Sequence, residues 1–306
     1  ARLLTLEMGK LVTEARAEVE LSAQIFEYYA ENAARLLAPE TLPVANPQEA
    51  TARIVHDPLG ILLAIEPWNF PYYQIARIIA PQLSAGNTIL LKHASNVPQS
   101  AARFDNLMRE AGLPEGGFTN LYATRKQIEM ILNDPRVQGV ALTGSEAAGA
   151  TVAEQAAKAL KKSTLELGGA DAFVVLADAE LEKTIKWAVF GRHWNGGQVC
   201  VSSKRMIIVK DIYDQFLQGY TEAVGKLFFK ALHVTTGFGC GLETLLFRVE
   251  LGVDELFDHV GAGRGRADAA GMRFVIVQSG LQVLVLDVSA CVLHRGEQRR
   301  LGERLR

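Results

Sequence analysis

The sequence has 306 residues, of which 49% are hydrophobic and 22% are charged, a composition typical of a globular protein long enough for two domains. Its formal net charge of −2 gives no reason to expect a nucleic acid or a membrane as a partner. The three cysteines are odd in number and widely spaced, so they predict neither a disulfide framework nor a metal site, and they favour the reducing cytoplasm.

Apolar spacing predicts that helices and strands alternate over the first half of the chain. We expect a helix at 11–38, a proline-rich loop, a strand at 61–65, a helix at 71–83, a strand at 88–91, a helix at 99–111, a strand at 139–142, an alanine-rich helix at 149–162 and a strand at 173–176. This alternation is typical of an α/β fold in which helices cover both faces of an open, mostly parallel sheet of Rossmann-like type. Ligands bind such sheets at the carboxyl ends of the strands, and several distinctive segments of this sequence fall there.

The last eighty or so residues differ in composition from the rest. Every proline lies at or before Pro135, and beyond Lys226 the only lysine is Lys230, against nine arginines. The apolar run at 274–293 contains Asp287 and two glutamines, which are costly in hydrocarbon. We therefore expect strands there and no membrane span.

Three residues have the chemistry for covalent catalysis. Cys200 ends the stretch Asn-Gly-Gly-Gln-Val-Cys, in which glycines allow close approach to a ligand and the thiolate is a strong nucleophile. Glu166 lies on an apolar strand before two glycines and suits a general base. Asn69 lies in a rigid turn between two prolines and could donate its side-chain NH₂ to a developing oxyanion. The structural alternatives are a buried thiol, a strand-end carboxylate in water and a packing corner.

Two strand ends have residues that suit a phosphate or a ribose. The strand at 139–142 runs into Thr-Gly-Ser and a helix, whose free N–H groups could bind a phosphate near Gly144 and Ser145, although Ser145 is also a good N-cap. Lys92 follows another strand and could hold a ribose or a phosphate, or could simply be solvated. The neighbouring His93 is expected to be a polar surface or packing residue. No G-x-G-x-x-G occurs, so the usual dinucleotide fingerprint is absent.

In order and spacing, these segments resemble those of the aldehyde dehydrogenase superfamily. The motifs are Pro-Trp-Asn-Phe-Pro, Lys-x-Ala, Thr-Gly-Ser, Leu-Glu-Leu-Gly-Gly and Gly-Gln-x-Cys, and the 34-residue step from Glu166 to Cys200 matches the family as well. The resemblance covers residues 1–226. Lys-His-Ala, Arg77 and Asn-Gly-Gly-Gln-Val-Cys are most similar to the NAD(P)-dependent succinate-semialdehyde dehydrogenases.

The resemblance implies that an aldehyde is oxidised to a carboxylic acid with NAD or NADP. Cys200 would add to the aldehyde, Asn69 and the Cys200 backbone N–H would hold the oxyanion, and Glu166 would activate water to hydrolyse the thioester. Arg77 would bind the far carboxylate of succinate semialdehyde, with a helix-surface ion pair as the alternative. NADP should be accepted, because Ser95 has no charge to repel a 2′-phosphate. The residues implied to bind the cofactor are Trp68, Lys92, Ser95, Gly144, Ser145 and Leu167.

The resemblance also implies a domain organisation. We expect a cofactor-binding domain at 1–167 that lacks its first stretch, and the start of an incomplete α/β catalytic domain, which carries the nucleophile, at 168–226. The tail at 227–306 does not match, so a shifted reading frame or a fused segment is our hypothesis for it. The alternative function is therefore a catalytically inactive fragment that retains at most dinucleotide binding. A homo-oligomer is expected if the family's subunit contact survives. A cysteine hydrolase that pairs Cys200 with His193 is disfavoured, because no acid or amide accompanies that histidine.

Overall fold

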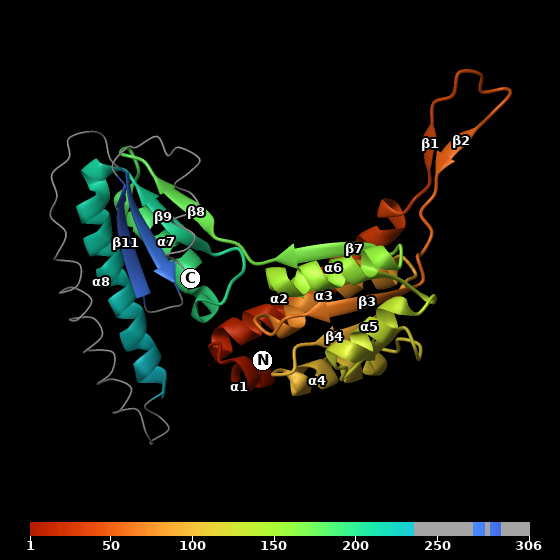
Figure 1. Cartoon of the computed structure of the whole chain (residues 1–306), viewed down its shortest axis with the longest axis horizontal. Helices are drawn as coiled ribbons and strands as arrows, with labels where there is room; N and C mark the ends of the chain where they lie inside the picture. The colour runs from red at the N-terminus through yellow and green to blue at the C-terminus, as the bar shows by residue number, and fades with distance from the viewer. Residues whose placement is uncertain (236–271, 279–281, 289–306) are drawn as a thin grey trace. The chain divides into compact units, whose positions relative to one another are not determined.

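A computed structural model describes residues 1–235, 272–278 and 282–288 of the chain (Figure 1). The chain forms two compact units, Ala1–Gly169 and Ala170–Arg306. The sequence placed the boundary after residue 167. None of the helices among the described residues is both long and apolar enough to cross a membrane.

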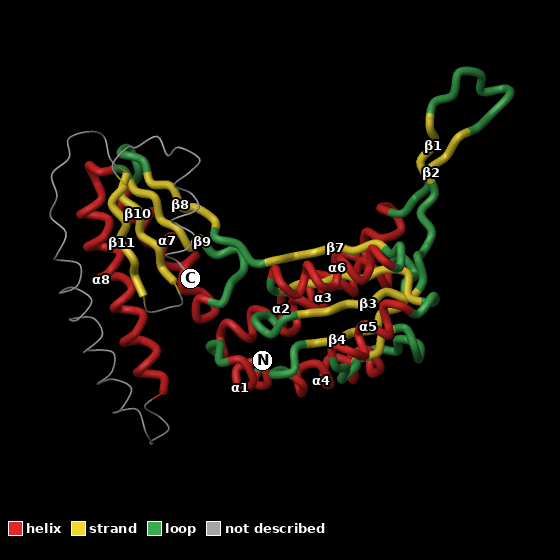
Figure 2. Tube along the Cα trace, in the orientation of Figure 1, coloured by secondary structure: helices red, strands yellow, loops and turns green. Residues whose placement is uncertain are grey.

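The first unit is built on a five-stranded sheet whose neighbouring strands are all parallel, in the order β5-β4-β3-β6-β7. This confirms the predicted α/β class with a parallel sheet. Figure 2 shows strands of this sheet in yellow among the helices of the unit in red. A short antiparallel hairpin, β1–β2, stands apart from the sheet. The elements in chain order are α1 (Arg2–Met8), α2 (Val12–Leu36), β1 (Glu40–Leu42), β2 (Ala52–Ile54), β3 (Ile61–Glu66), α3 (Pro71–Ser84), β4 (Thr88–His93), α4 (Pro98–Glu110), β5 (Phe118–Asn120), α5 (Arg125–Asn133), β6 (Val137–Gly144), α6 (Glu146–Lys158) and β7 (Lys162–Leu167).

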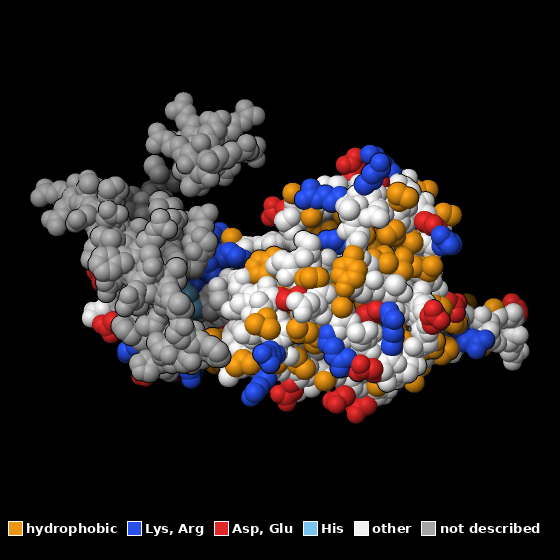
Figure 3. All heavy atoms as spheres, turned by 90° about the horizontal axis from the view of Figure 1, so that it is seen from below, with side chains coloured by type: hydrophobic (Ala, Val, Ile, Leu, Met, Phe, Trp, Pro, Cys, Tyr) orange, Lys and Arg blue, Asp and Glu red, His pale blue; other side chains and the backbone are white. Residues whose placement is uncertain are grey.

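Two apolar clusters, one on each face, hold this sheet between its helices. Adjacent residues of a strand point to opposite faces, and in β3 Leu63 belongs to the cluster shared with α5 and α6, whereas Ala64 belongs to the cluster shared with α1 to α4. Strands buried on both faces need continuous apolar runs, which is why 61–65 is apolar at every position. Acidic and basic side chains are interspersed over the face of this unit that Figure 3 shows.

The strand order reverses at β3, and this reversal positions the candidate site. The chain passes from β3 to β4 and β5 on one side, and then returns to place β6 on the other side of β3. A reversal of this kind leaves a crevice at the carboxyl ends of the two strands, where ligands bind. Here β3 ends at Glu66, directly before the Pro-Trp-Asn-Phe-Pro turn, and β6 ends at Gly144.

The helix that follows β4 takes its N-terminal cap from a distant helix. Helix α4 begins at a proline, and its N-cap residue Val97 provides no side-chain cap. Instead, the Glu7 carboxylate of α1 accepts hydrogen bonds from the backbone N–H groups of Gln99 and Ser100, each at 2.8 Å. A carboxylate at this position satisfies free N–H groups and interacts favourably with the helix dipole.

The second unit contains a four-stranded sheet in the order β11-β10-β9-β8. Strands β8 and β9 are parallel, and the other two pairs are antiparallel. Its elements are β8 (Asp171–Val175), α7 (Leu181–His193), the 3₁₀ helix η1 (Trp194–Gly197), β9 (Ser203–Ile208), α8 (Lys210–Thr235), β10 (Met272–Gln278) and β11 (Gln282–Val288). The last two strands overlap the apolar run at 274–293 for which strands were predicted, although β10 begins two residues before it. Residues 279–281 and 289–293 of that run lie outside the described residues.

Several elements of the first unit differ from the sequence-based expectation. The hairpin β1–β2 occupies the expected proline-rich loop, and α1, β5 and α5 were not predicted. Helix α6 begins at Glu146 instead of residue 149, because the Ser145 hydroxyl caps it by accepting the backbone N–H of Ala148 at 3.3 Å. It also ends earlier than predicted, before Leu160, whose φ of 56° is incompatible with a continuing right-handed helix.

Candidate active site

The turn after β3 places Asn69 at the carboxyl edge of the first sheet. Trp68 is 37% exposed and Asn69 is half-buried, so both side chains lie at the border between core and solvent. Pro71 then begins α3, and Phe70, its N-cap residue, provides no side-chain cap. The orientation of the turn therefore depends on groups from other elements.

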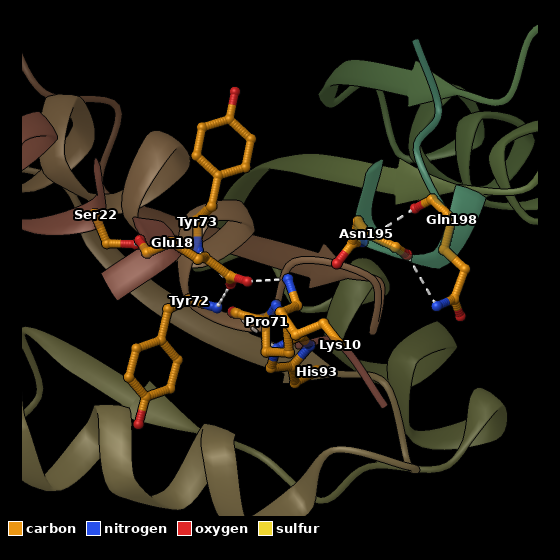
Figure 4. Close-up of polar contacts among 9 residues, drawn as sticks. All are labelled: Lys10, Glu18, Ser22, Pro71, Tyr72, Tyr73, His93, Asn195 and Gln198. Atoms are coloured by element: carbon orange, nitrogen blue, oxygen red, sulfur yellow. Dashed lines mark hydrogen bonds and ion pairs between the residues drawn. The ribbon is translucent and has the colours of Figure 1, made fainter. Parts of the chain in front are cut away.

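A buried ion pair from the start of the chain supplies the missing cap of α3 (Figure 4). Glu18 of α2 accepts hydrogen bonds from the backbone N–H groups of Tyr72 and Tyr73, at 2.8 and 3.2 Å. The same carboxylate pairs with Lys10, and the side chains of both partners are at most 2% exposed. The Lys10 ammonium also lies 4.1 Å from the centroid of the Phe70 ring, a cation–π distance. The pair thus fixes both the helix start and the turn that carries Asn69.

His93, at the end of β4, joins the two ends of the same turn. Its Nε2 lies 3.0 Å from the carbonyl oxygen of Pro71, and its Nδ1 lies 3.1 Å from that of Glu66 and 2.9 Å from the backbone nitrogen of Ala94. Burial lowers the pKa of His93, so the ring is neutral near neutral pH. The Ala94 N–H needs an acceptor at Nδ1, which leaves the proton on Nε2 to be donated to Pro71. His93 is therefore a packing residue that supports the turn.

Arg77 and Glu166 lie together at the same edge of the sheet. The Arg77 Nη2 donates to the Thr143 hydroxyl at 2.6 Å, and its Nη1 lies 3.9 Å from a carboxylate oxygen of Glu166. The Arg77 side chain is 23% exposed and the Glu166 side chain 57%. The prediction that Glu166 has apolar surroundings is therefore wrong, because β7 is an edge strand of its sheet and this carboxylate faces solvent.

The residues predicted to bind a cofactor lie at or just beyond the carboxyl ends of four strands, β3, β4, β6 and β7. Lys92 is the penultimate residue of β4, and Ser95 is exposed just beyond the strand. Burial, and then the charge of Arg125 at the start of α5, lower the pKa of Lys92. Gly144 and Ser145 lie between β6 and α6. Cationic and hydroxyl donors at this edge of the sheet, together with the N-terminus of α6, suit the phosphates of a dinucleotide.

Gly149 allows Leu167 to pack closely on α6. A Cβ at Gly149 would lie 2.5 Å from a terminal methyl of Leu167, closer than side chains approach each other. Leu167 is the last residue of β7 and follows Glu166 directly. Its position is therefore set by contact with the helix whose N-terminus is the candidate phosphate site.

The second unit carries Cys200 in a loop between η1 and β9, and the backbone of η1 directly before this loop is tightly constrained. Asn195, Gly196 and Gly197 have φ values of 56°, 64° and 75°, all in the left-handed region. A Cβ at Gly197 would lie 3.0 Å from a guanidinium nitrogen of Arg192, which donates to the Gly197 carbonyl at 3.0 Å. These contacts explain the two adjacent glycines in physical terms. The half-buried thiol is free.

Two cationic side chains from the flanking elements contact the backbone around the cysteine, Arg192 from α7 and Lys204 from β9. The Lys204 ammonium donates to the carbonyl oxygen of Cys200 at 3.0 Å. Arg192 is 3% exposed and lies under the glycines that precede the cysteine. By contrast, the His193 ring pairs with the Tyr220 hydroxyl at 3.0 Å.

Sequence reasoning missed four residues that support the site, namely Lys10, Glu18, Glu66 and Thr143. Glu18 lies on the buried stripe of α2 together with Ala15 and Ser22, and a carboxylate in an otherwise buried stripe is a signal that could have identified it. Glu66 gave a similar signal, as the one acidic residue closing an apolar strand. Among the described residues, no cluster of three His, Cys, Asp or Glu side chains is arranged to hold a metal ion.

Comparison with known proteins identifies the class to which this fold and these residues belong. The model of the aldehyde dehydrogenase family matches residues 1–239. The chain therefore belongs to the aldehyde dehydrogenase family, as its motifs predicted, and the match extends beyond residue 226, where the resemblance was expected to end.

The chain is also similar to individual members of this family. The chain is 52% identical over 217 residues to a succinate-semialdehyde dehydrogenase (NADP+) of Deinococcus radiodurans, covering 71% of this chain and 45% of that protein. It is 44% identical over 260 residues to one of Mycobacterium avium, covering 85% of this chain and 54% of that protein. The crystal structure of succinic semialdehyde dehydrogenase from Streptococcus pyogenes with NADP+ matches at a TM-score of 0.70 and 47% identity, over 72% of this chain and 48% of that one. The chain thus spans about half the length of these relatives.

Proposed function

We propose that this chain oxidises an aldehyde to its carboxylic acid with NAD(P), and that succinate semialdehyde is the substrate. The observation that supports this most strongly is the grouping of Arg77, Thr143 and Glu166 at the carboxyl edge of the first sheet, the edge at which Asn69 also lies. Family membership supports the reaction class. The relatives named for succinate semialdehyde support the substrate.

In the proposed reaction, Cys200 forms the covalent intermediate. Its thiolate adds to the aldehyde carbon, while the Asn69 side-chain amide and the Cys200 backbone N–H donate to the oxygen. One such donor contributes about 3 kcal/mol in enzymes where it has been removed. When bound, the nicotinamide cofactor supplies the hydride acceptor. Glu166 then takes a proton from a water molecule that attacks the thioester, which releases the acid and restores the thiolate.

Arg77 is proposed to bind the far carboxylate of the substrate. Its guanidinium is partly exposed and offers several N–H donors in a fixed plane, which suits a bidentate carboxylate. The hydrogen bond from Nη2 to Thr143 holds that plane in place. The long 3.9 Å contact with Glu166 leaves the guanidinium able to exchange one carboxylate for another.

Trp68, Lys92, Ser95, Gly144, Ser145 and Leu167 are proposed to hold the cofactor. Lys92 and the uncharged Ser95 would accept a 2′-phosphate, and the nearby charge of Arg125 favours the same group. The N–H groups at the start of α6 would bind the pyrophosphate. NADP is therefore expected to bind at least as well as NAD.

The experiment is a turnover assay on the purified full chain. Succinate semialdehyde and NADP or NAD are added, and the absorbance of the reduced cofactor is followed for the native chain and for Cys200→Ala. Turnover that disappears in Cys200→Ala supports the proposal. Cofactor binding without turnover in the native chain would favour the alternative of an inactive fragment. The observation that favours this alternative is that the chain matches only about half the length of its relatives.

We also propose that the chain works as a homo-oligomer in the cytoplasm. The β1–β2 hairpin supports self-association, because it stands away from the sheet of its own unit and exposes Leu42, Ile54 and the following Val55 (Figure 1). A catalytic thiol requires reducing conditions, which supports the compartment. Light scattering on the native chain and on Ile54→Asp checks the assembly, since the charge should lower the oligomer mass.

A further inference from the structure

Glu66 is a buried acid that the proposed reaction does not use. It is the last residue of β3, is 2% exposed, and lies where the strand order of the sheet reverses. Within the described part of the chain, neither of its carboxyl oxygens has a hydrogen-bond partner of ordinary geometry. An ionised carboxylate in such surroundings would be very costly, so the neutral acid is favoured.

Three side chains from other elements act on the Glu66 carboxyl group, namely Thr143 of β6, Arg77 of α3 and Glu166 of β7. Burial raises the pKa of Glu66 to about 8, and this outweighs the Thr143 hydroxyl and the Arg77 charge, which lower it. The charge of Glu166 raises it further. His93, from β4, touches only the backbone carbonyl of Glu66 and is neutral in this range, because burial lowers its own pKa.

The Arg77 guanidinium therefore interacts with two carboxyl groups, those of Glu66 and Glu166. Arg77 bonds to Thr143 at 2.6 Å and lies 3.9 Å from Glu166, and its charge also acts on Glu66. While Glu66 is neutral, the one carboxylate within ion-pair distance of Arg77 among the described residues is the solvent-facing Glu166. If Glu66 ionised, two carboxylates would compete for this charge, and a third one from a ligand would be repelled.

We propose that Glu66 is a specificity-determining residue. As a neutral acid it leaves the Arg77 charge available to a ligand carboxylate, and when ionised it competes with that ligand carboxylate for the charge. This rests on the proposed function, in which Arg77 binds the substrate carboxylate. The ligand class is a short aliphatic acid, and its affinity should fall as the pH rises past the ionisation of Glu66. An uncharged aldehyde of the same length should not sense this change.

The test measures binding, so that it does not depend on turnover. Succinate is titrated into the full chain by calorimetry at about pH 6.5 and about pH 9.5, for the native chain, Glu66→Gln and Glu115→Gln. Glutamine keeps the shape of the neutral acid but does not ionise, and Glu115 is an exposed matched control in the loop before β5. The native chain and Glu115→Gln should lose affinity by about tenfold, the effect of one pKa unit of coupling. Glu66→Gln should bind equally well at both pH values.

Each other outcome has a defined meaning. Equal losses in the native chain and in Glu66→Gln would overturn the inference, and so would a native chain that does not bind succinate at either pH or binds it equally at both. If Arg77→Gln, which should not bind, retained native affinity, the carboxylate would be held elsewhere and the inference would be wrong. Glu66-dependent binding in a chain without turnover would instead contradict the proposed oxidation and leave this role of Glu66 standing.

Discussion

Three glutamates of the first unit differ in the burial and the partners of their carboxyl groups. Glu18 is buried but has the Lys10 ammonium and two backbone N–H groups as partners. Glu166 is buried little and faces solvent. Glu66 is buried without partners of ordinary geometry among the described residues, and burial raises its pKa to about 8. Burial without such partners favours the neutral acid at Glu66.

The raised pKa of Glu66 predicts how stability depends on pH. Its pKa in the folded chain, about 8, lies above its usual 4.5, so between these values the folded state keeps a proton that the unfolded state has lost. The free energy of unfolding should therefore fall as the pH rises through this window, by on the order of 4 kcal/mol. Urea unfolding from about pH 5 to about pH 9 should show this fall in the native chain and a much smaller one in Glu66→Gln. Parallel curves for the two proteins would contradict the assignment.

Substitution of Gly197 tests how this single residue constrains the loop that carries Cys200. Alanine there must adopt a φ of 75° and crowd Arg192, so Gly197→Ala should lower the free energy of unfolding by about 1–3 kcal/mol and change the rate at which iodoacetamide labels Cys200. Gly191→Ala is the matched control. It lies in α7 with open space around its Cβ position, so it should stabilise the chain by about 0.5–1 kcal/mol and leave labelling unchanged. Similar effects of both changes on labelling would refute this account of the loop.

At the scale of helices and strands, the spacing of apolar residues predicted the elements whose formation depends on residues close in the sequence. Helices α2, α3 and α4 and strands β3, β4 and β6 were expected within a few residues of their bounds, because their apolar spacing is unambiguous. The caps of α3 and α4 could not be predicted, since Glu18 lies 54 residues before Tyr72 and Glu7 lies 92 before Gln99. The hairpin β1–β2 was missed because its exposed residues lack alternation.

The Lys10–Glu18 pair predicts strong coupling between α2 and the start of α3. Removing either partner leaves a buried charge alone, so Lys10→Met and Glu18→Gln should each lower the free energy of unfolding by about 3–5 kcal/mol. The double variant should lose much less than the sum, because no uncompensated charge remains. The exposed Glu20→Gln, on the same helix, should stay within about 0.5 kcal/mol of the native chain. Additive losses in a urea-unfolding double-mutant cycle would show that the two side chains are not coupled.

At the scale of the whole molecule, the order and spacing of short motifs predicted the family, and the parallel sheet explains why the motifs of the first unit meet. Asn69, Gly144 and Glu166 follow or end β3, β6 and β7, whose carboxyl ends share one edge. Individual motifs could not predict this, because each also has an ordinary structural role. The supporting contacts of Arg77 with Thr143 were likewise beyond sequence reasoning, since they depend on the reversal of strand order at β3.

The central proposal is that aldehyde chemistry takes place on Cys200 and that Glu166 completes it. Mass spectrometry of the acid-quenched chain, after mixing with succinate semialdehyde and NADP, tests this most directly. In Glu166→Gln, hydrolysis should slow while acylation continues, so an acyl adduct should accumulate on the peptide that contains Cys200, and it should be absent in Cys200→Ala. Reduced cofactor formed by Cys200→Ala, or an adduct on another residue, would contradict the proposal.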